Sequence, residues 1–286
     1  MKESRLYQTY SNPVVIGGVG GSGTRLIAEC LNQLGFFTGE DLNPFNDNLW
    51  FTLLFKHERI LSASAEEFAG LVEIFVKGMS GGAGFTEEEI ALVKSLTLED
   101  RLEQHSRSWL RARAKSLLSK KRQERPLIGW GWKEPNSHIV MDRLSQCFSR
   151  IKYIHVARNG LDMAHSSNQN QLKFWGKYFL GNDYAISPRD SLKYWCIIHR
   201  RVLDIGRSMN GNFLFLNYDD FCSRPESGIA RICSFLELDP TEAQVASLKQ
   251  SIKPPASIGR FKTHGTHIFD PSDVQYVKEL GFDVLD

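Results

Sequence analysis

Two short segments of the sequence contain residues that are suited to binding phosphate groups. In Val14–Arg25 an apolar run ends in a turn rich in glycine, and in Ile151–Ser166 another apolar run ends at Arg158. Backbone N–H groups of a glycine-rich turn can surround an anion where the next helix presents its unpaired donors. Arg158 and Ser166, about two helical turns apart, form a second clamp for a phosphate. A nucleotide with phosphate groups at two ends would satisfy both segments.

The two segments are expected to be strands that lead directly into helices. Four short apolar runs fit buried strands followed by turn or helix signals: Val14–Ile16, Leu127–Trp132, Ile151–Ala157 and Phe213–Asn217. The first run is followed by a helix whose apolar stripe ends at Gly35. Strands that alternate with helices in this way predict an α/β fold of three layers, in which helices cover both faces of a central parallel sheet.

The stretch 43–125 has a different, mostly helical pattern. A glycine-rich break there precedes a capping box formed by Thr86 and Glu89, which restarts a helix. We interpret 43–125 as a helical insertion in a single domain that covers 1–286. We predict that it forms a lid over the strand ends, where a second substrate, the acceptor, would bind. Its last helix, 106–125, is rich in Arg and Lys. A solvated helix face is the simpler interpretation of that helix, and guidance of an anionic ligand is the alternative.

Composition excludes several classes of protein. With 286 residues, of which 42% are hydrophobic, the chain can bury one substantial core. Its 35 basic and 33 acidic residues nearly balance, so we expect no nucleic-acid partner and no general attraction to an anionic membrane. The cysteines are scattered without Cys-x-x-Cys spacing, which is typical of reduced thiols in a cytoplasmic protein. The polar N-terminal segment and the lack of a long apolar run predict neither a secretion signal nor a membrane span.

The glycine-rich turn taken alone is compatible with more than one kind of nucleotide site. Gly18, Gly20 and Gly23 match the fingerprint of dinucleotide-binding folds. Glu40 or Asp41 follows at about the distance expected of the acid that binds the ribose. That acid should end a second buried strand, yet only a pair of apolar residues stands shortly before it. A nicotinamide or flavin site is therefore an alternative that the flanking sequence disfavours.

The same turn also has the glycine spacing of an ATP-binding Walker A loop. Thr24, however, stands where that motif has the lysine that contacts the β- and γ-phosphates, and Arg25 stands where it has the Ser or Thr that holds magnesium. An ATP-dependent kinase would lack both of its defining side chains. A turn with no ligand at all is disfavoured, because glycines, Ser22 and Thr24 crowd into so short a segment.

A third interpretation joins the separate segments. Ser22–Thr24, with Arg158 and Ser166 further on, resembles the sulfotransferases that use 3'-phosphoadenosine 5'-phosphosulfate (PAPS). Downstream, Asn217–Phe221 resembles the Tyr-Glu-Asp-Leu segment of that family, and Ser257–Lys262 resembles its C-terminal loop, which returns to the 3'-phosphate. These matches occur in the order in which the family has them, and the helix that binds the 3'-phosphate is the most specific of them.

The resemblance covers Val14–Arg25 and Trp130–Lys262, and it implies a P-loop-containing nucleoside triphosphate hydrolase-like (sulfotransferase) fold. It also implies in-line transfer of a sulfuryl group from PAPS, as co-substrate, to a hydroxyl or amine acceptor. No metal is required, because a sulfuryl group carries less charge than a phosphoryl group. A non-catalytic nucleotide-binding protein on the same fold is the alternative. The residues implied in binding PAPS are Gly20, Gly21, Ser22, Gly23, Thr24, Arg25, Arg158, Ser166, Tyr218, Gly259, Arg260 and Lys262.

The resemblance further suggests which side chains act on the transferring group. Lys133 follows a predicted strand and resembles a lysine of the family that reaches the active site, so we expect it to contact the sulfuryl group or the bridging oxygen. Many relatives place Lys or Arg directly before Ser-Gly-Thr, where this chain has Gly21. We predict that Arg25 supplies the missing positive charge. Both side chains would stabilise negative charge that develops during transfer.

The general base is expected among four acidic or imidazole side chains. Glu40 and Asp41 lie in a Gly-Glu-Asp segment that resembles the Gly-Glu-Glu segment of tyrosylprotein sulfotransferases, which carries a catalytic carboxylate. We favour Asp41, then Glu40, and an N-cap or surface acid is the structural alternative for both. Glu134 and His138 are the other candidates, although Glu134 can also simply pair with the neighbouring Lys133.

Adenine requires an apolar or aromatic slot. By resemblance, Tyr218 contacts the base. Trp50 and Phe51 could stack on it from the insertion, and a place in the hydrophobic core is the alternative for both.

Overall fold

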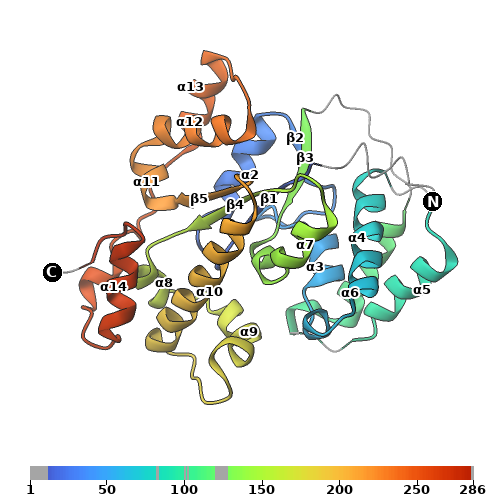
Figure 1. The fold of residues 1–286 in the computed structure, drawn as a ribbon, viewed down its shortest axis with the longest axis horizontal. Helices are drawn as coiled ribbons and strands as arrows, with labels where there is room; N and C mark the ends of the chain where they lie inside the picture. The colour runs from blue at the N-terminus through green and yellow to red at the C-terminus, as the bar shows by residue number, and fades with distance from the viewer. Residues whose placement is uncertain (1–11, 82–83, 100, 102, 120–127, 285–286) are drawn as a thin grey trace.

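A single parallel sheet organises the protein. The computed structural model describes residues 12–81, 84–99, 101, 103–119 and 128–284. Within them the strand order is β2-β3-β1-β4-β5, and every pairing is parallel (Figure 1). This confirms the parallel sheet expected from the sequence. The strands are β1 (Val14–Gly18), β2 (Phe36–Phe37), β3 (Gly129–Lys133), β4 (Lys152–Ala157) and β5 (Phe213–Asn217).

Helices cover both faces of the sheet, because side chains alternate between the faces along each strand. On β1, Val14 and Ile16 pack into one hydrophobic cluster and Val15 packs into the other. The expected three layers are therefore present (Figure 1). The first cluster is closed by α2 (Thr24–Gln33), α11 (Tyr218–Ser223), α12 (Pro225–Leu236) and α13 (Glu242–Ser251). The second is closed by α7 (Met141–Cys147), α8 (Gly160–Ala164), α9 (Asn170–Leu180), α10 (Pro188–Ser208), α14 (Pro271–Glu279) and the helices between β2 and β3.

The edge strand β2 is an element that the sequence pattern does not indicate. It pairs only Phe36 and Phe37 with β3, and two residues cannot display the alternation by which a strand is recognised. The other strands correspond to the predicted runs, although Leu127, the first residue of the run that contains β3, lies outside the described residues. The helix after β1 ends just before Gly35, whose φ of 91° is the left-handed conformation that terminates helices.

The region between β2 and β3 is helical, as predicted for the insertion. At the start of α5 the capping box is formed: Thr86 Oγ1 accepts from the Glu89 backbone, and a Glu89 carboxylate oxygen accepts from the Thr86 backbone. Residues 120–125, at the end of the expected basic helix, lie outside the described part of the chain. The role of this region as a lid stays a prediction. Its helices are α3 (Leu49–Phe55), α4 (Ala65–Met79), α5 (Glu87–Leu96) and α6 (Arg107–Leu118), with the 3-10 turns η1 (Glu58–Leu61) and η2 (Glu103–His105).

Aromatic side chains attach α3 to the sheet. Trp50 and Phe51 are fully buried, and the Phe51 ring stacks on Trp132 of β3 with centroids 5.5 Å apart. Phe75 of α4 meets the same indole edge-on at 5.1 Å. Trp50 and Phe51 therefore belong to the hydrophobic core, the alternative considered for them, and their buried rings are not available to stack on adenine.

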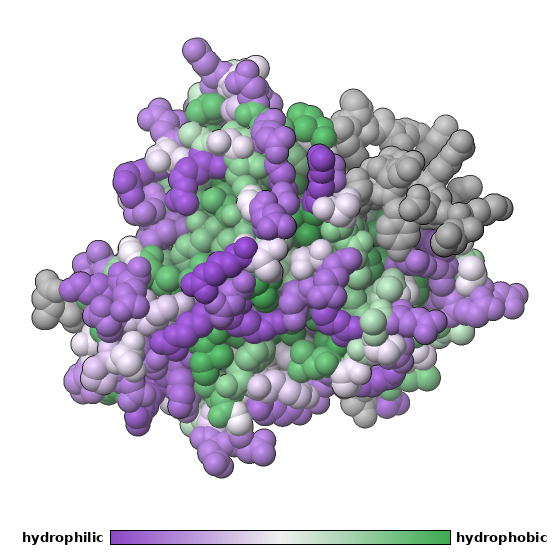
Figure 2. All heavy atoms as spheres, viewed as in Figure 1, coloured by the Kyte–Doolittle hydropathy of each residue, from purple (hydrophilic) through white to green (hydrophobic). Residues whose placement is uncertain are grey.

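The outer surface is mixed in polarity. Hydrophilic side chains cover much of the face seen in Figure 2, and hydrophobic ones form separate patches there. Among the described residues, each helix is too short or too polar to cross a bilayer. The cysteines are all unpaired thiols, and most of them are buried. Residues 1–11, which include most of the polar N-terminal segment, lie outside the described residues.

Candidate functional site

The glycine-rich loop joins the carboxyl end of β1 to α2. Gly21 and Gly23 have φ values of 95° and 94°, in the left-handed region that favours glycine. Gly23 is also the N-cap of α2, and no side chain caps the free N–H groups of that helix. A Cβ atom on Gly23 would lie 2.1 Å from the Tyr218 ring. The loop thus presents backbone donors at a helix N-terminus, with the Tyr218 ring packed directly against it.

The two polar side chains of the glycine-rich loop are buried. Ser22 and Thr24 are buried, and the Ser22 hydroxyl has no hydrogen-bond partner among the described residues. Gln171 of α9 donates to the Gly18 carbonyl at 3.1 Å, and its side-chain oxygen contacts His138 Nε2 at 3.0 Å. The loop is therefore fixed to the helical layer, and its one unpartnered buried hydroxyl is a feature that calls for an explanation.

A cavity of about 580 Å³ opens beside the glycine-rich loop. Its walls come from that loop, from the turn that precedes α3, from α3 itself, from η2 and α6, from the end of β3, and from the start of α9. Charged groups from several of these elements face one another there. The lining residues are Gly20, Gly21, Gly23, Thr24, Arg25, Leu26, Asn43, Phe45, Asp47, Leu49, Thr52, Lys56, Gln104, His105, Trp109, Lys133, Glu134, Pro135, Asn168, Asn170 and Tyr218.

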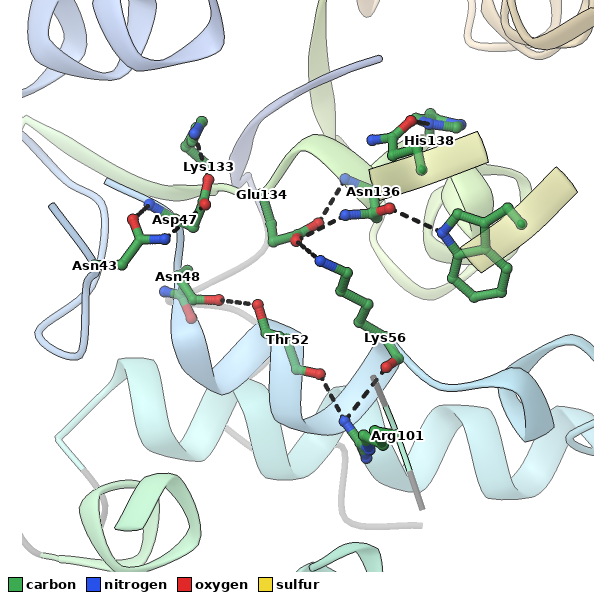
Figure 3. A network of polar contacts seen from close by, with 12 residues as sticks. Asn43, Asp47, Asn48, Thr52, Lys56, Arg101, Lys133, Glu134, Asn136 and His138 are labelled. Atoms are coloured by element: carbon green, nitrogen blue, oxygen red, sulfur yellow. Dashed lines mark hydrogen bonds and ion pairs between the residues drawn. The ribbon is translucent and has the colours of Figure 1, made fainter. Parts of the chain in front are cut away.

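Lys133 reaches this cavity from the end of β3, as its position in the sequence predicts. Its side chain is buried, and Nζ donates to the Phe45 carbonyl at 3.0 Å and pairs with the Asp47 carboxylate (Figure 3). The other oxygen of Asp47 accepts from Asn43 Nδ2 at 2.8 Å. Sequence reasoning missed Asp47, which lies in a turn without a recognisable motif.

Arg25 lines the cavity from its outer side. Its guanidinium is about half exposed, contacts Glu29 at 3.5 Å and lies 6.0 Å from the centre of the Phe45 ring. It thus lies at the rim, where its charge is screened more strongly than that of the buried Lys133, and its role in supplying positive charge stays a prediction.

Glu134 is the most deeply buried carboxylate in the cavity wall. One carboxylate oxygen accepts from Asn136 Nδ2 at 2.9 Å and lies 3.8 Å from the ammonium of Lys56 (Figure 3). Asn136 in turn accepts from the Trp175 indole at 2.8 Å. Burial raises the pKa of Glu134, and the nearby Asp47 charge adds to that rise, while Lys56 opposes it. Sequence reasoning missed Lys56, which no local motif marks.

The other candidate bases lie away from the cavity lining. Asp41 pairs with Arg113 of α6 at 3.1 Å, and Glu40 is exposed. His138, in the 3-10 turn η3 (Pro135–Ile139), is fully buried, and burial lowers its pKa to about 3. Of the four predicted side chains, Glu134 is the one among the lining residues.

A second cluster of charges forms at the end of β4, next to β1. The Arg158 side chain is buried; it donates to Ser257 Oγ at 2.9 Å and lies 3.7 Å from Asp162 and 3.9 Å from Asp219. The Asp162 carboxylate accepts from the backbone N–H group of Gly259 at 2.8 Å and from that of Phe261, two residues further on, at 3.0 Å. These contacts bring the C-terminal loop onto α8.

The remaining predicted residues lie around this cluster. Arg260, at the start of the 3-10 turn η4 (Arg260–Thr263), donates to the His165 carbonyl at 3.2 Å. Ser166, next in the chain, accepts from the Asn168 backbone at 3.2 Å. Lys262 is exposed. The C-terminal loop therefore contacts α8 and the residues that follow it, and the predicted binding of a 3'-phosphate by these residues stays a prediction.

A comparison with protein families matches residues 13–242 to the model described as "Sulfotransferase family". The chain belongs to the sulfotransferase family. A search of curated protein sequences gave no match for this sulfotransferase.

Solved structures of sulfotransferases resemble the chain. The sulfotransferase domain of the Synechococcus PCC 7002 olefin synthase is 19% identical, with 96% of both chains covered and a TM-score of 0.50. The sulfotransferase domain from the curacin biosynthetic pathway is 14% identical, with 96% of this chain and 99% of that chain covered and a TM-score of 0.49. Mouse sulfotransferase SULT7A1 complexed with PAP is 12% identical, with 98% and 89% covered and a TM-score of 0.39. The first of these similarities agrees with a shared sulfotransferase fold.

Proposed function

We propose that this sulfotransferase transfers a sulfuryl group from PAPS to a hydroxyl group of an acceptor. The observation that supports this proposal most directly is that the glycine-rich loop after β1 and the charged cluster around Arg158 after β4 lie at the carboxyl ends of adjacent strands. Ligands of open parallel sheets bind at such ends. Two anion sites on neighbouring strands suit a nucleotide with phosphate groups at two ends.

The residues present fit the donor. The Ser22 hydroxyl, unpartnered among the described residues, and the backbone donors at the start of α2 would hold the phosphosulfate. Arg158, Ser166 and the loop that begins at Ser257 would hold the 3'-phosphate. Tyr218, packed on the loop, would contact adenine. Within the described residues no group of three or more His, Cys, Asp or Glu side chains could hold a metal ion.

Transfer requires an attacking oxygen, a base and positive charge around the sulfur. The acceptor oxygen attacks sulfur in line with the bridging oxygen, the bond between sulfur and that oxygen breaks, and the bisphosphate leaves with the electron pair. Lys133 and Arg25 stabilise the negative charge on the leaving side. We assign the acceptor proton to Glu134 rather than Asp41, because Glu134 lines the cavity while Asp41 is held by Arg113.

The acceptor would enter between the helices that follow β2 and the end of β3. Lys56 and Thr52 of the α3 segment and Trp109 of α6 line that side of the cavity, which supports the role of 43–125 as a lid. The unpaired cysteines suit a reducing compartment, so we propose that the reaction takes place in the cytoplasm.

Calorimetric titration with adenosine 3',5'-bisphosphate, 5'-AMP, ATP and NAD, without magnesium, tests the donor site. We expect the bisphosphate to bind at least tenfold more tightly than 5'-AMP, a difference of about 1.4 kcal/mol. Transfer of labelled sulfate from PAPS to a panel of sugars, phenols and alkyl alcohols then tests catalysis. A preference for ATP or NAD would contradict the proposal, and tight bisphosphate binding without transfer to any acceptor would favour a non-catalytic binding protein.

A further inference from the structure

The end of α3 faces Glu134 across the cavity. Lys56 is the C-cap residue of α3, and its ammonium lies 3.8 Å from a carboxylate oxygen of Glu134. The Lys56 side chain is 14% exposed and the Glu134 side chain 2%, and both line the cavity. The pair is therefore shielded from bulk solvent on one side and open to a bound substrate on the other. Charges in such a place interact more strongly than on an exposed surface.

Arg101 fixes the backbone from which Lys56 projects. Its guanidinium donates to the carbonyls of Thr52 at 3.0 Å and Lys56 at 3.4 Å (Figure 3). It also donates to the Leu53 carbonyl at 2.8 Å. The last carbonyls of a helix lack partners within the helix and carry its negative end. The buried Arg101 guanidinium supplies both the missing hydrogen-bond donors and a positive charge at this end of the helix. The Glu99 carboxylate, 3.6 Å away, balances the charge of the guanidinium. Although burial lowers the pKa of Arg101 to about 10, the group stays charged at neutral pH.

The other groups around Glu134 do not favour its ionised form in the same way. Asp47 repels it, and the Lys133 ammonium is engaged by Asp47 and by a carbonyl. Asn136 donates to Glu134 from Nδ2 at 2.9 Å and from its backbone N–H at 2.5 Å; these hydrogen bonds also lower the pKa of Glu134, but Asn136 carries no charge. His105, in the cavity wall, has a pKa lowered to about 3 by burial and by Lys56 and Arg101, so it is uncharged.

His138 is also uncharged, because burial lowers its pKa to about 3, and it hydrogen-bonds Gln171. Among the described residues, Lys56 is thus the cation within ion-pair distance of Glu134. A buried carboxylate beside another carboxylate would otherwise retain its proton.

We propose that Lys56 is a positioning residue that keeps Glu134 ionised for proton transfer, and that Arg101 holds Lys56 at the required place. This inference rests on the proposed function, in which Glu134 takes the acceptor proton. A base must be ionised before it can accept that proton. Removal of Lys56 therefore raises the pH at which Glu134 becomes active.

The first test is the pH dependence of transfer by Lys56→Met. We expect the acid limb of the kcat profile to move up by at least one pH unit, so that the rate at pH 7 falls about tenfold or more and recovers as the pH is raised. Lys77→Met is the matched control, because Lys77 makes a half-buried ion pair with Glu89 at 2.6 Å outside the cavity. The control should keep the wild-type profile. A wild-type profile in Lys56→Met would overturn the inference.

A second test does not need an acceptor. Urea unfolding of the wild type, Lys56→Met, Glu134→Gln and the double variant measures the coupling between the two side chains. We expect a coupling of at least tenfold in the unfolding equilibrium constant at pH 8, which shrinks as Glu134 becomes protonated at lower pH. Coupling that is absent at pH 8 would refute the ion pair. If the wild type transfers no sulfate although this coupling is present, the proposed function fails and the pair itself stands.

Discussion

Two parts of the proposed site are built in different ways. The donor side, as we propose it, consists of the turns that directly follow β1 and β4, which are shaped by glycines and by backbone contacts such as the two N–H groups from which Asp162 accepts. The proposed acceptor side is the cavity wall formed by α3 and the end of β3, where side chains meet across long separations, such as Lys56 with Glu134 and Lys133 with Asp47. Backbone sites depend on local glycine and turn chemistry, whereas side-chain sites depend on how distant helices pack. The donor side is therefore the part that a sequence motif can encode.

The largest expected effect separates the candidate bases on the acceptor side. Glu134→Gln should lower kcat by about 10²–10⁴-fold, because it removes the group that we propose takes the acceptor proton. Binding of the bisphosphate, measured by calorimetry, should change little. Asp41→Asn should retain most of kcat, because Asp41 contacts Arg113 outside the cavity. The opposite ranking of the two variants would return Asp41 to the role of base and contradict the assignment to Glu134.

A glycine substitution tests the backbone character of the donor side. Gly23→Ala introduces a Cβ atom 2.1 Å from the Tyr218 ring at a φ of 94°. We expect a loss of about 2–5 kcal/mol in the free energy of unfolding, from strain and overpacking together. Gly211→Ala is the matched control, since Gly211 also has a positive φ, 83°, but its Cβ would meet no atom within 4 Å. Its cost should be strain alone, about 1–2 kcal/mol, and equal losses in urea unfolding would contradict the close approach.

Removal of the arginine at the end of β4 tests the 3'-phosphate clamp. Arg158→Ala should weaken binding of adenosine 3',5'-bisphosphate by about 1.5–3 kcal/mol, the usual contribution of a charged hydrogen bond. Binding of 5'-AMP should be nearly unchanged, because it lacks the 3'-phosphate. Calorimetry on both ligands measures the difference, and an equal loss for both would show that Arg158 acts through the fold instead.

The smallest effect concerns Asp219, which lies beside Arg158. Burial raises the pKa of Asp219 to about 6, above its ordinary value of 3.8. The folded protein therefore binds the proton more tightly than the unfolded chain, and this contribution to stability is lost as the pH rises through about 6. In urea unfolding, the difference in the free energy of unfolding between Asp219→Asn and the wild type should move by about 1–2 kcal/mol in favour of the variant as the pH rises from 4.5 to 7.5. A constant difference across this range would exclude the raised pKa.

The same contrast explains what the sequence could predict. The long strands, α2 and the capping box at Thr86 follow from periodicity and capping, and the structure has them. The position of Lys133 at the cavity could be predicted because this residue directly follows the predicted apolar run, and in the structure it is the last residue of β3. β2 is too short to leave a pattern, and Asp47 and Lys56 gain their partners only when α3 packs on β3. The preference for Asp41 as base relied on a local resemblance in sequence, and such a resemblance cannot show that Arg113 lies next to Asp41.

One feature of the cavity bears on the order of events in a catalytic cycle. The Lys133 ammonium forms an ion pair with Asp47 within the protein. The turn that carries Asp47 is also held by Asn43, whose side-chain oxygen accepts from the backbone N–H groups of Phe45 and Asp47. In the proposed reaction, an arriving donor has to compete with this internal counter-ion for the lysine. The turn would keep its shape when the lysine departs, because its contacts with Asn43 do not involve Lys133. We therefore expect binding of the donor to leave the Asp47 carboxylate in the cavity without its counter-ion.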